Sequence, residues 1–227
     1  MSPKNHDVYL EIGEKRVFAG SVAWPGWCRS GRDEESALQA LFDSGPRYAQ
    51  IVGTTDLRFE APKQISVFNF VERLDGNRTT DFGAPNMPLA RDQEPIDIDG
   101  SERFKTLLIA CWSAFDVTVK EAEGKQLRVG PRGGGRDLEK IIEHVMGADE
   151  SYLKQIGWKI ENFQEAEPDE RLARTRDEIL QGFTASARGE LPTEGPRGGK
   201  RWSPRYFVRR VAWHVIDHAW EIEDRIL

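Results

Sequence analysis

From Ser101 to the end of the chain, apolar residues recur at steps of three and four positions. Four segments of about 20 residues carry this pattern, at roughly 101–123, 137–158, 169–189 and 203–227. Each stripe would face one side of an α-helix, and a single helix of this kind cannot bury its stripe alone. The pattern therefore predicts a four-helix bundle, with Ser203 as N-cap and Pro204 as the first residue of the last helix.

The N-terminal part follows a different pattern, which predicts a small α+β domain. Residues 8–28 alternate and are rich in β-formers on both sides of a Gly13-Glu14 turn, which is typical of a hairpin. An acidic turn at Asp33 then precedes a helical stripe, and residues 64–74 predict a further strand. Prolines gather in the stretch that follows. The predicted organisation is a domain at 1–83, a linker at 84–100 and the bundle at 101–227.

Composition narrows the range of partners and compartments. The net charge of −6 provides no global positive field for nucleic acid or an anionic membrane, and no run of 18 apolar residues predicts a membrane span. Cys28 and Cys111 are the only cysteines, and the start, MSPKNHDVYLEIG, has no pattern of a secretion leader. We therefore expect two free thiols in a cytoplasmic protein.

Three of the four histidines fall where one metal ion could gather them. His214 and His218 lie four residues apart, so they project from the same face of the last predicted helix. His144 lies on the second predicted helix, at a matching depth if the two helices run antiparallel. Three imidazoles hold an ion and leave one coordination position open, as a catalytic site requires. The sequence predicts a divalent-metal site with Zn as the first choice and Ni or Fe as alternatives.

Glu221 follows His218 by three residues and projects close to the same face. It could orient an imidazole, accept a proton in catalysis or serve as a fourth ligand, and it could also be an ordinary surface carboxylate. The segment HVIDH, at 214–218, lacks the glutamate that follows the first histidine in HExxH zinc peptidases. Peptidase chemistry is therefore not expected.

The stretches LEKIIEHVMGADESYLKQIGW and RRVAWHVIDHAWEIEDRIL carry these histidines. In order, helical placement and spacing they resemble the DinB/YfiT-like family of metal-binding four-helix bundles, over about 101–227. The resemblance implies His144, His214 and His218 as metal ligands. It also implies an S-transferase or isomerase that acts on a small molecule with a low-molecular-weight thiol, although many members of the family have no assigned reaction.

The stretch VFAGSVAWPGWCRSGRDEESALQAL resembles the HicB-like antitoxin domain in the order of its strand, Pro-Gly turn and acidic helix start. This resemblance implies a module for packing or for contact with a protein partner. The alternative to an enzyme is accordingly a non-catalytic partner-binding module with a structural bundle. A homodimer is also compatible with the sequence.

Two further features are open to more than one interpretation. The connections 130–136 (GPRGGGR) and 195–201 (GPRGGKR) are near copies, and each predicts either a sharp solvated turn or an anion site. The large aromatic side chains of the bundle could line a pocket over the metal or fill the core; they are Trp112, Tyr152, Trp158, Trp213 and Trp220.

Overall fold

The computed structural model describes residues 5–129, 135–160 and 166–227. Within them the chain divides into two compact units, Met1–Arg91 and Asp92–Leu227. The boundary falls inside the segment 84–100, and the independent folding of the two units stays a prediction. None of the helices in these residues is both long enough and apolar enough to span a bilayer.

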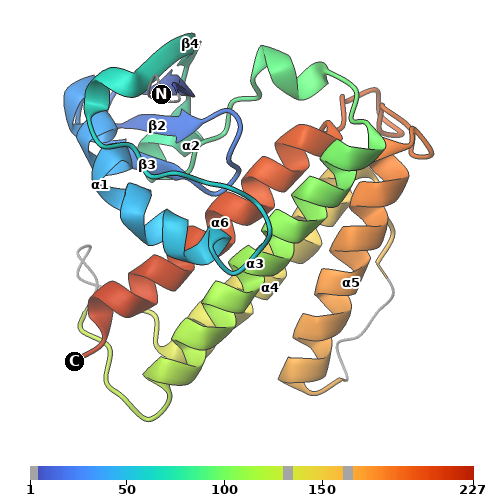
Figure 1. The fold of residues 1–227 in the computed structure, drawn as a ribbon. Coiled ribbons are helices and arrows are strands. Elements are labelled where there is room, and N and C mark those ends of the chain that lie inside the picture. Colours follow the sequence, from blue (N-terminus) through green and yellow to red (C-terminus); the bar gives the residue numbers. More distant parts are fainter. Residues whose placement is uncertain (1–4, 130–134, 161–165) are drawn as a thin grey trace. The chain divides into compact units, whose positions relative to one another are not determined.

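The first unit is a four-stranded mixed sheet with one long helix (Figure 1). Strand order is β3-β2-β1-β4, in which β1 pairs antiparallel with β2 and parallel with β4. The predicted hairpin, helix and later strand are all present. The elements are β1 (His6–Ile12), β2 (Val17–Ser21), β3 (Cys28–Gly31), α1 (Glu34–Val52), η1 (Ile65–Val67), β4 (Phe68–Asp75) and α2 (Arg78–Phe82). The expectation of an α+β fold is therefore confirmed at this level.

Trp27 is the centre of this unit's core and is fully buried. Its indole Nε1 donates hydrogen bonds to the Leu41 carbonyl at 3.0 Å and to Ser44 Oγ at 3.1 Å, which tie the Pro-Gly turn to α1. The rings of His6 and Phe59 pack edge-on against it at 5.2 and 4.9 Å between centroids. Trp27 is therefore a core residue of this unit.

The second unit contains the four predicted helices, which pack against one another in a bundle. A short η2 turn (Ala90–Gln93) precedes them, and the first helix begins at Ile98, inside the predicted linker, because Asp97 caps it by accepting from the Gly100 N–H. Ser203 caps the last helix and Pro204 begins it, as predicted. Their bounds are α3 (Ile98–Ala122), α4 (Leu138–Ile156), α5 (Pro168–Ala187) and α6 (Pro204–Arg225).

Contacts at the helix ends fix the directions within the bundle. The Trp202 N–H donates to the Gln155 carbonyl at 3.1 Å, and Arg225 Nη2 donates to the Arg136 carbonyl at 2.8 Å. The start of α6 therefore lies beside the end of α4, and the end of α6 beside the start of α4, so these helices are antiparallel. Helix α3 runs parallel to α6, since Thr118 near its end binds Glu223 near the end of α6.

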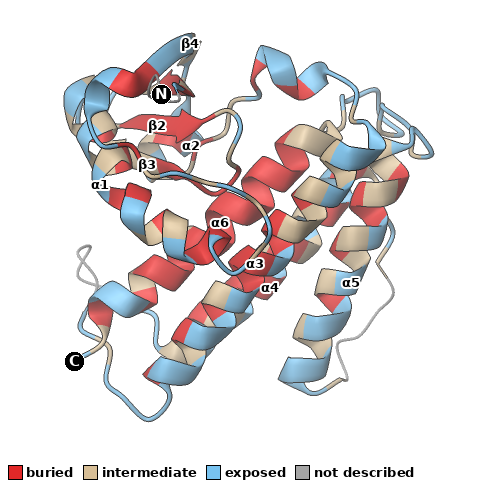
Figure 2. Ribbon diagram, viewed as in Figure 1, coloured by how far each residue is buried: buried red, intermediate tan, exposed pale blue. Residues whose placement is uncertain are grey.

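Helix α6 is the most deeply buried of the four, and Figure 2 shows it buried along most of its length. Helix α5 instead keeps one exposed face and contributes a narrow buried stripe that includes Ile179 and Phe183. A helix buried on nearly all sides normally carries apolar residues. The buried arginines and histidines of α6 are therefore polar groups whose burial has to be explained.

The structure describes one of the two glycine-rich connections in full and only the end of the other. Most of the first one, residues 130–134, lies outside the described residues. The second closes on itself, because the Gly195 N–H donates to the Gly199 carbonyl at 2.8 Å and Glu194 pairs with Lys200 in an isolated bridge. A sharp turn accounts for this connection.

Candidate metal centre

The structure brings His144, His214 and His218 together. Each offers one nitrogen, and the three nitrogens lie within 4.8 Å of one another. The Nε2 atoms of His144 and His214 are 3.2 Å apart. Two nitrogens bound to one tetrahedral ion at about 2.0–2.1 Å lie about 3.3 Å apart, so this separation suits two ligands of the same ion.

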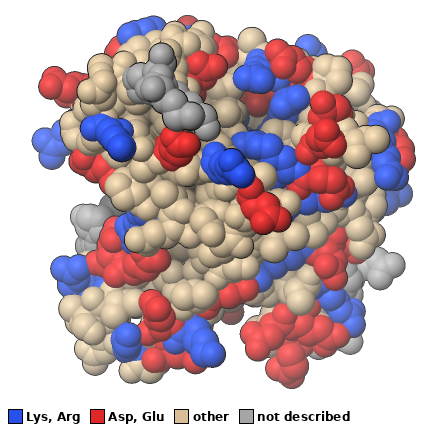
Figure 3. Space-filling model, viewed as in Figure 1, with Lys and Arg blue, Asp and Glu red and all other residues tan. Residues whose placement is uncertain are grey.

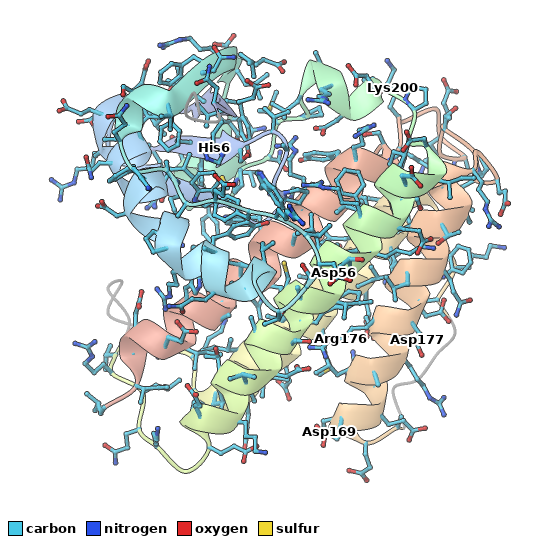
Figure 4. The ribbon with its side chains drawn as sticks, in the orientation of Figure 1. His6, Asp56, Asp169, Arg176, Asp177 and Lys200 are labelled. Atoms are coloured by element: carbon cyan, nitrogen blue, oxygen red, sulfur yellow. The ribbon has the colours of Figure 1, made fainter. Side chains whose placement is uncertain are left out.

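The antiparallel run of α4 and α6 produces this convergence. His144 lies on α4 and faces two imidazoles of α6 across the helix pair, with ring centroids 5.0 Å from His214 and 4.9 Å from His218. His214 and His218 lie one turn apart, with centroids separated by 4.6 Å. The fourth histidine, His6, belongs to β1 in the other unit and contacts the core tryptophan there (Figure 4).

Glu221 contacts the cluster through His218. Its Oε2 lies 2.8 Å from His218 Nδ1, and its Oε1 accepts from Arg225 Nη1 at 2.6 Å. The hydrogen bond with His218 and the nearby Arg225 guanidinium lower the pKa of Glu221 to about 2. The carboxylate is therefore ionised at neutral pH, so His218 Nδ1 carries the proton and Nε2 keeps its lone pair for a metal.

The other two imidazoles are held in the form that a metal ligand needs. Burial, with smaller contributions from His218 and Arg136, lowers the pKa of His144 to about 4. Burial is also the main cause that lowers the pKa of His214 well below its ordinary value, and Arg210 adds to it. Both rings are neutral at pH 7, and a neutral imidazole binds metal whereas a protonated one does not.

The donor set fits a divalent ion of the zinc type. Three imidazole nitrogens at ligand spacing suit Zn²⁺, Ni²⁺ or Fe²⁺, and the described residues add no fourth histidine, cysteine or carboxylate to this group. His218 has the second hydrogen bond that usually orients a ligating imidazole. His214 does not, because its Nδ1 is buried without a hydrogen-bond partner among the described residues.

Neither cysteine is placed to act as a nucleophile. Both are buried and neither forms a disulfide, which agrees with the prediction of two thiols. Cys111 lies on the buried side of α3, and burial raises the pKa of its thiol to about 12. Because the thiolate is the reactive form, any sulfur chemistry at the histidines needs a thiol from outside the chain.

The aromatic side chains named from the sequence separate into two groups. The rings of Tyr152 and Trp213 lie 5.7 and 6.0 Å from the His214 ring. Trp112 instead packs below the Arg176 guanidinium, and Trp158 donates to Glu178 on α5. Tyr152 and Trp213 thus lie beside the histidines, and Trp220 is almost fully buried.

Sequence reasoning missed Arg210, which lies one turn before His214 on the same face of α6. Its guanidinium is stacked near the rings of Tyr152, Trp202 and Trp213, with its carbon 5.3, 5.8 and 5.1 Å from their centroids. The signal was available in the spacing, because positions 210, 214, 218 and 221 continue a single helical stripe.

Comparisons with known proteins identify no relative of this chain. No protein-family model matches the chain, and no curated protein or solved structure is significantly similar to it.

Proposed function

We propose that the bundle, Asp92–Leu227, binds one divalent metal ion through His144, His214 and His218. The observation that carries this proposal is the convergence of three ligand nitrogens within 4.8 Å from two antiparallel helices. The DinB/YfiT-like family, which the bundle resembles in sequence, holds its metal in the same way. Zn²⁺ is the first candidate, and Ni²⁺ or Fe²⁺ suit the same three nitrogens.

We further propose an S-transferase or isomerase activity that uses a small thiol. When bound, a divalent ion of this type supplies a Lewis acid that lowers the pKa of a coordinated thiol. Glu221 fixes the tautomer of His218, and burial keeps the other two imidazoles neutral. The buried Cys111 supplies no thiolate of its own, which favours an exogenous thiol.

Among the roles open to Glu221, its contacts favour orienting His218. A carboxyl group with a pKa of about 2 is a weak proton acceptor at neutral pH. Both of its oxygens are also engaged, one by His218 and one by Arg225. We therefore assign Glu221 to the support of a ligand.

A partner-binding function is the second candidate, and the edge of the first unit's sheet favours it. Strand β4 is an edge strand, and its Phe70 and Val71 side chains are 45% and 47% exposed. An edge with apolar side chains is a site where another chain can add a strand. We propose this unit as a HicB-like module whose partner would be a protein. The face drawn in Figure 3 intersperses basic and acidic side chains, which gives no reason to propose nucleic acid instead.

A cobalt-substituted protein tests the thiol proposal. Metal-free protein is loaded with Co²⁺ and titrated with 2-mercaptoethanol while the visible spectrum is recorded. We expect a new sulfur-to-cobalt charge-transfer band in the wild type and in His6→Gln, and no band in His214→Ala. Protein that holds Co²⁺ but gives no spectral change with the thiol would refute the thiol chemistry and leave only the metal.

A further inference from the structure

We propose that Arg210 anchors a carboxylate of the ligand that enters the metal centre, so that the substrate or thiol of this site is an acid. This inference rests on the proposed function and specifies its ligand class. It comes from a buried cation beside the histidines that has no anionic partner in the described part of the chain.

The Arg210 side chain is buried, with 6% of the residue exposed. Its Nη2 donates to Tyr152 Oη at 3.1 Å. Its Nε and Nη1 are buried without any hydrogen-bond partner among the described residues, and these two nitrogens carry three of the five N–H groups of a guanidinium. Arginine stays protonated in proteins, so this site contains a full charge with most of its donors unused.

Aromatic rings surround the guanidinium but cannot replace an anion. Tyr152, Trp202 and Trp213 all lie within 6 Å of its carbon. Ring faces stabilise a cation only partly, and an unpaired buried charge remains costly. The N–H groups of a guanidinium lie in its plane, and a flat carboxylate can accept from two of them along one edge.

Carboxylates on the neighbouring helix do not balance this charge. Glu150 is paired with Arg171 on α5 at 2.5 Å. Asp149 is fully buried, and burial raises the pKa of its carboxyl to about 8, so it is mostly neutral at pH 7. A divalent ion bound to the histidines would add further positive charge to the site that contains Arg210.

Arg210 lies within reach of the ligand that those histidines would hold. It precedes His214 by four residues on α6, so the two residues share a face and are separated by one turn, about 5.4 Å of rise. Both residues also lie beside the Trp213 ring, whose centroid is 5.1 Å from the Arg210 guanidinium carbon and 6.0 Å from the His214 ring. Because the Arg210 guanidinium carbon and the His214 ring lie 5.3 and 5.7 Å from the same Tyr152 ring, a small molecule that carries both a thiol and a carboxylate suits the site.

A matched pair of thiols tests the proposal on metal-loaded protein. 3-Mercaptopropionate and its neutral isostere 3-mercaptopropanamide are titrated into the Co²⁺-loaded full chain, with the visible spectrum as readout. We expect the acid to bind about ten- to a hundredfold more tightly than the amide, since a hydrogen-bonded charge pair contributes this much. Arg210→Gln should abolish the preference, Arg210→Lys should restore part of it, and Arg205→Gln, on the same helix, should retain it.

The outcomes separate this inference from the metal proposal. Equal affinities for the acid and the amide in the wild type would overturn the anchor while the thiol proposal stands, and this comparison does not require the variants to fold. If the wild type binds no metal, the proposed function fails. The carboxylate-binding role of Arg210 can then still be tested on metal-free protein. Its side-chain ¹⁵Nε resonance, assigned with Arg210→Lys, should shift during a titration with propionate, and an unchanged resonance would overturn the anchor.

Discussion

Replacing Asp149 by asparagine should make the stability of the bundle less dependent on pH. Asp149 lies on α4 with 0% exposure, and both carboxylate oxygens lack a hydrogen-bond partner among the described residues. Burial raises its pKa from 3.8 to about 8, while Arg176, which lies between α3 and α5 in Figure 4, lowers the pKa less strongly and Glu150 raises it slightly. Asparagine has nearly the same size and does not ionise.

The direction and the magnitude of the change in stability with pH follow from proton linkage. Between pH 3.8 and pH 8 the folded state binds more protons at Asp149 than the unfolded state does. Stability therefore falls as the pH rises through this window, by about 1.4 kcal/mol per pH unit at most. From pH 5 to pH 7 the loss through this one group is about 3 kcal/mol. The unmet hydrogen bonds of the introduced amide cost about 1–3 kcal/mol at every pH, so they do not change the slope.

Urea unfolding followed by far-ultraviolet circular dichroism measures this difference. Wild type, Asp149→Asn and the control Glu143→Gln, an exposed carboxylate on the same helix, are compared at pH 5, 6, 7 and 8 with a metal chelator present. The stability of Asp149→Asn relative to the wild type should grow with pH, whereas Glu143→Gln should follow the wild type. A free-energy difference between Asp149→Asn and wild type that is the same at all four pH values would refute the reasoning.

Two further sets of variants test the support of the histidines and the packing of the bundle. Glu221→Gln removes the charge that holds His218, so the metal Kd should rise about 10–100-fold in a chelator competition; Glu223→Gln should leave it unchanged, and equal values for both variants would contradict the assigned role. Gly182→Ala should lower the free energy of unfolding by about 1–3 kcal/mol, because its new Cβ would lie 3.0–3.2 Å from three core side chains. Gly147→Ala, whose Cβ meets nothing within 4 Å, should instead raise it by about 1 kcal/mol, and urea unfolding that ranks the two alanine variants the other way would contradict this packing.

Local sequence patterns were enough to predict most of the bundle. Each long helix has a stripe of its own, and the cap at Ser203 was read directly from the chain. The cap at Asp97 was not, so the sequence placed the start of α3 three residues too late. The shortest elements gave no comparable signal. Strand β3 has four residues and α2 has five, too few for a period to emerge, and α2 exists because Asn77 caps it.

The pairing of His214 with His218 was predictable for the same local reason, whereas adding His144 required the assumption that its helix runs antiparallel to the last one. The surroundings of the three histidines were not predictable. The i, i+4 spacing of His214 and His218 is a property of one helix. The burial of Arg210 depends on Tyr152 and Trp202, which come from other segments of the chain. From the sequence alone, the arginines of the run Arg209-Arg210 would be expected to lie in solvent. The side chains that bury Arg210 become known only from the structure.

The most direct measurement of the central claim is the metal content of protein purified without an affinity tag. Elemental analysis of the wild type, His214→Ala and His6→Gln compares one proposed ligand with the histidine that lies outside the cluster. The account predicts about one equivalent of Zn, Ni or Fe per chain in the wild type and in His6→Gln, and almost none in His214→Ala. Equal metal content in all three proteins, or no metal in wild type that has been supplied with each ion, would contradict it.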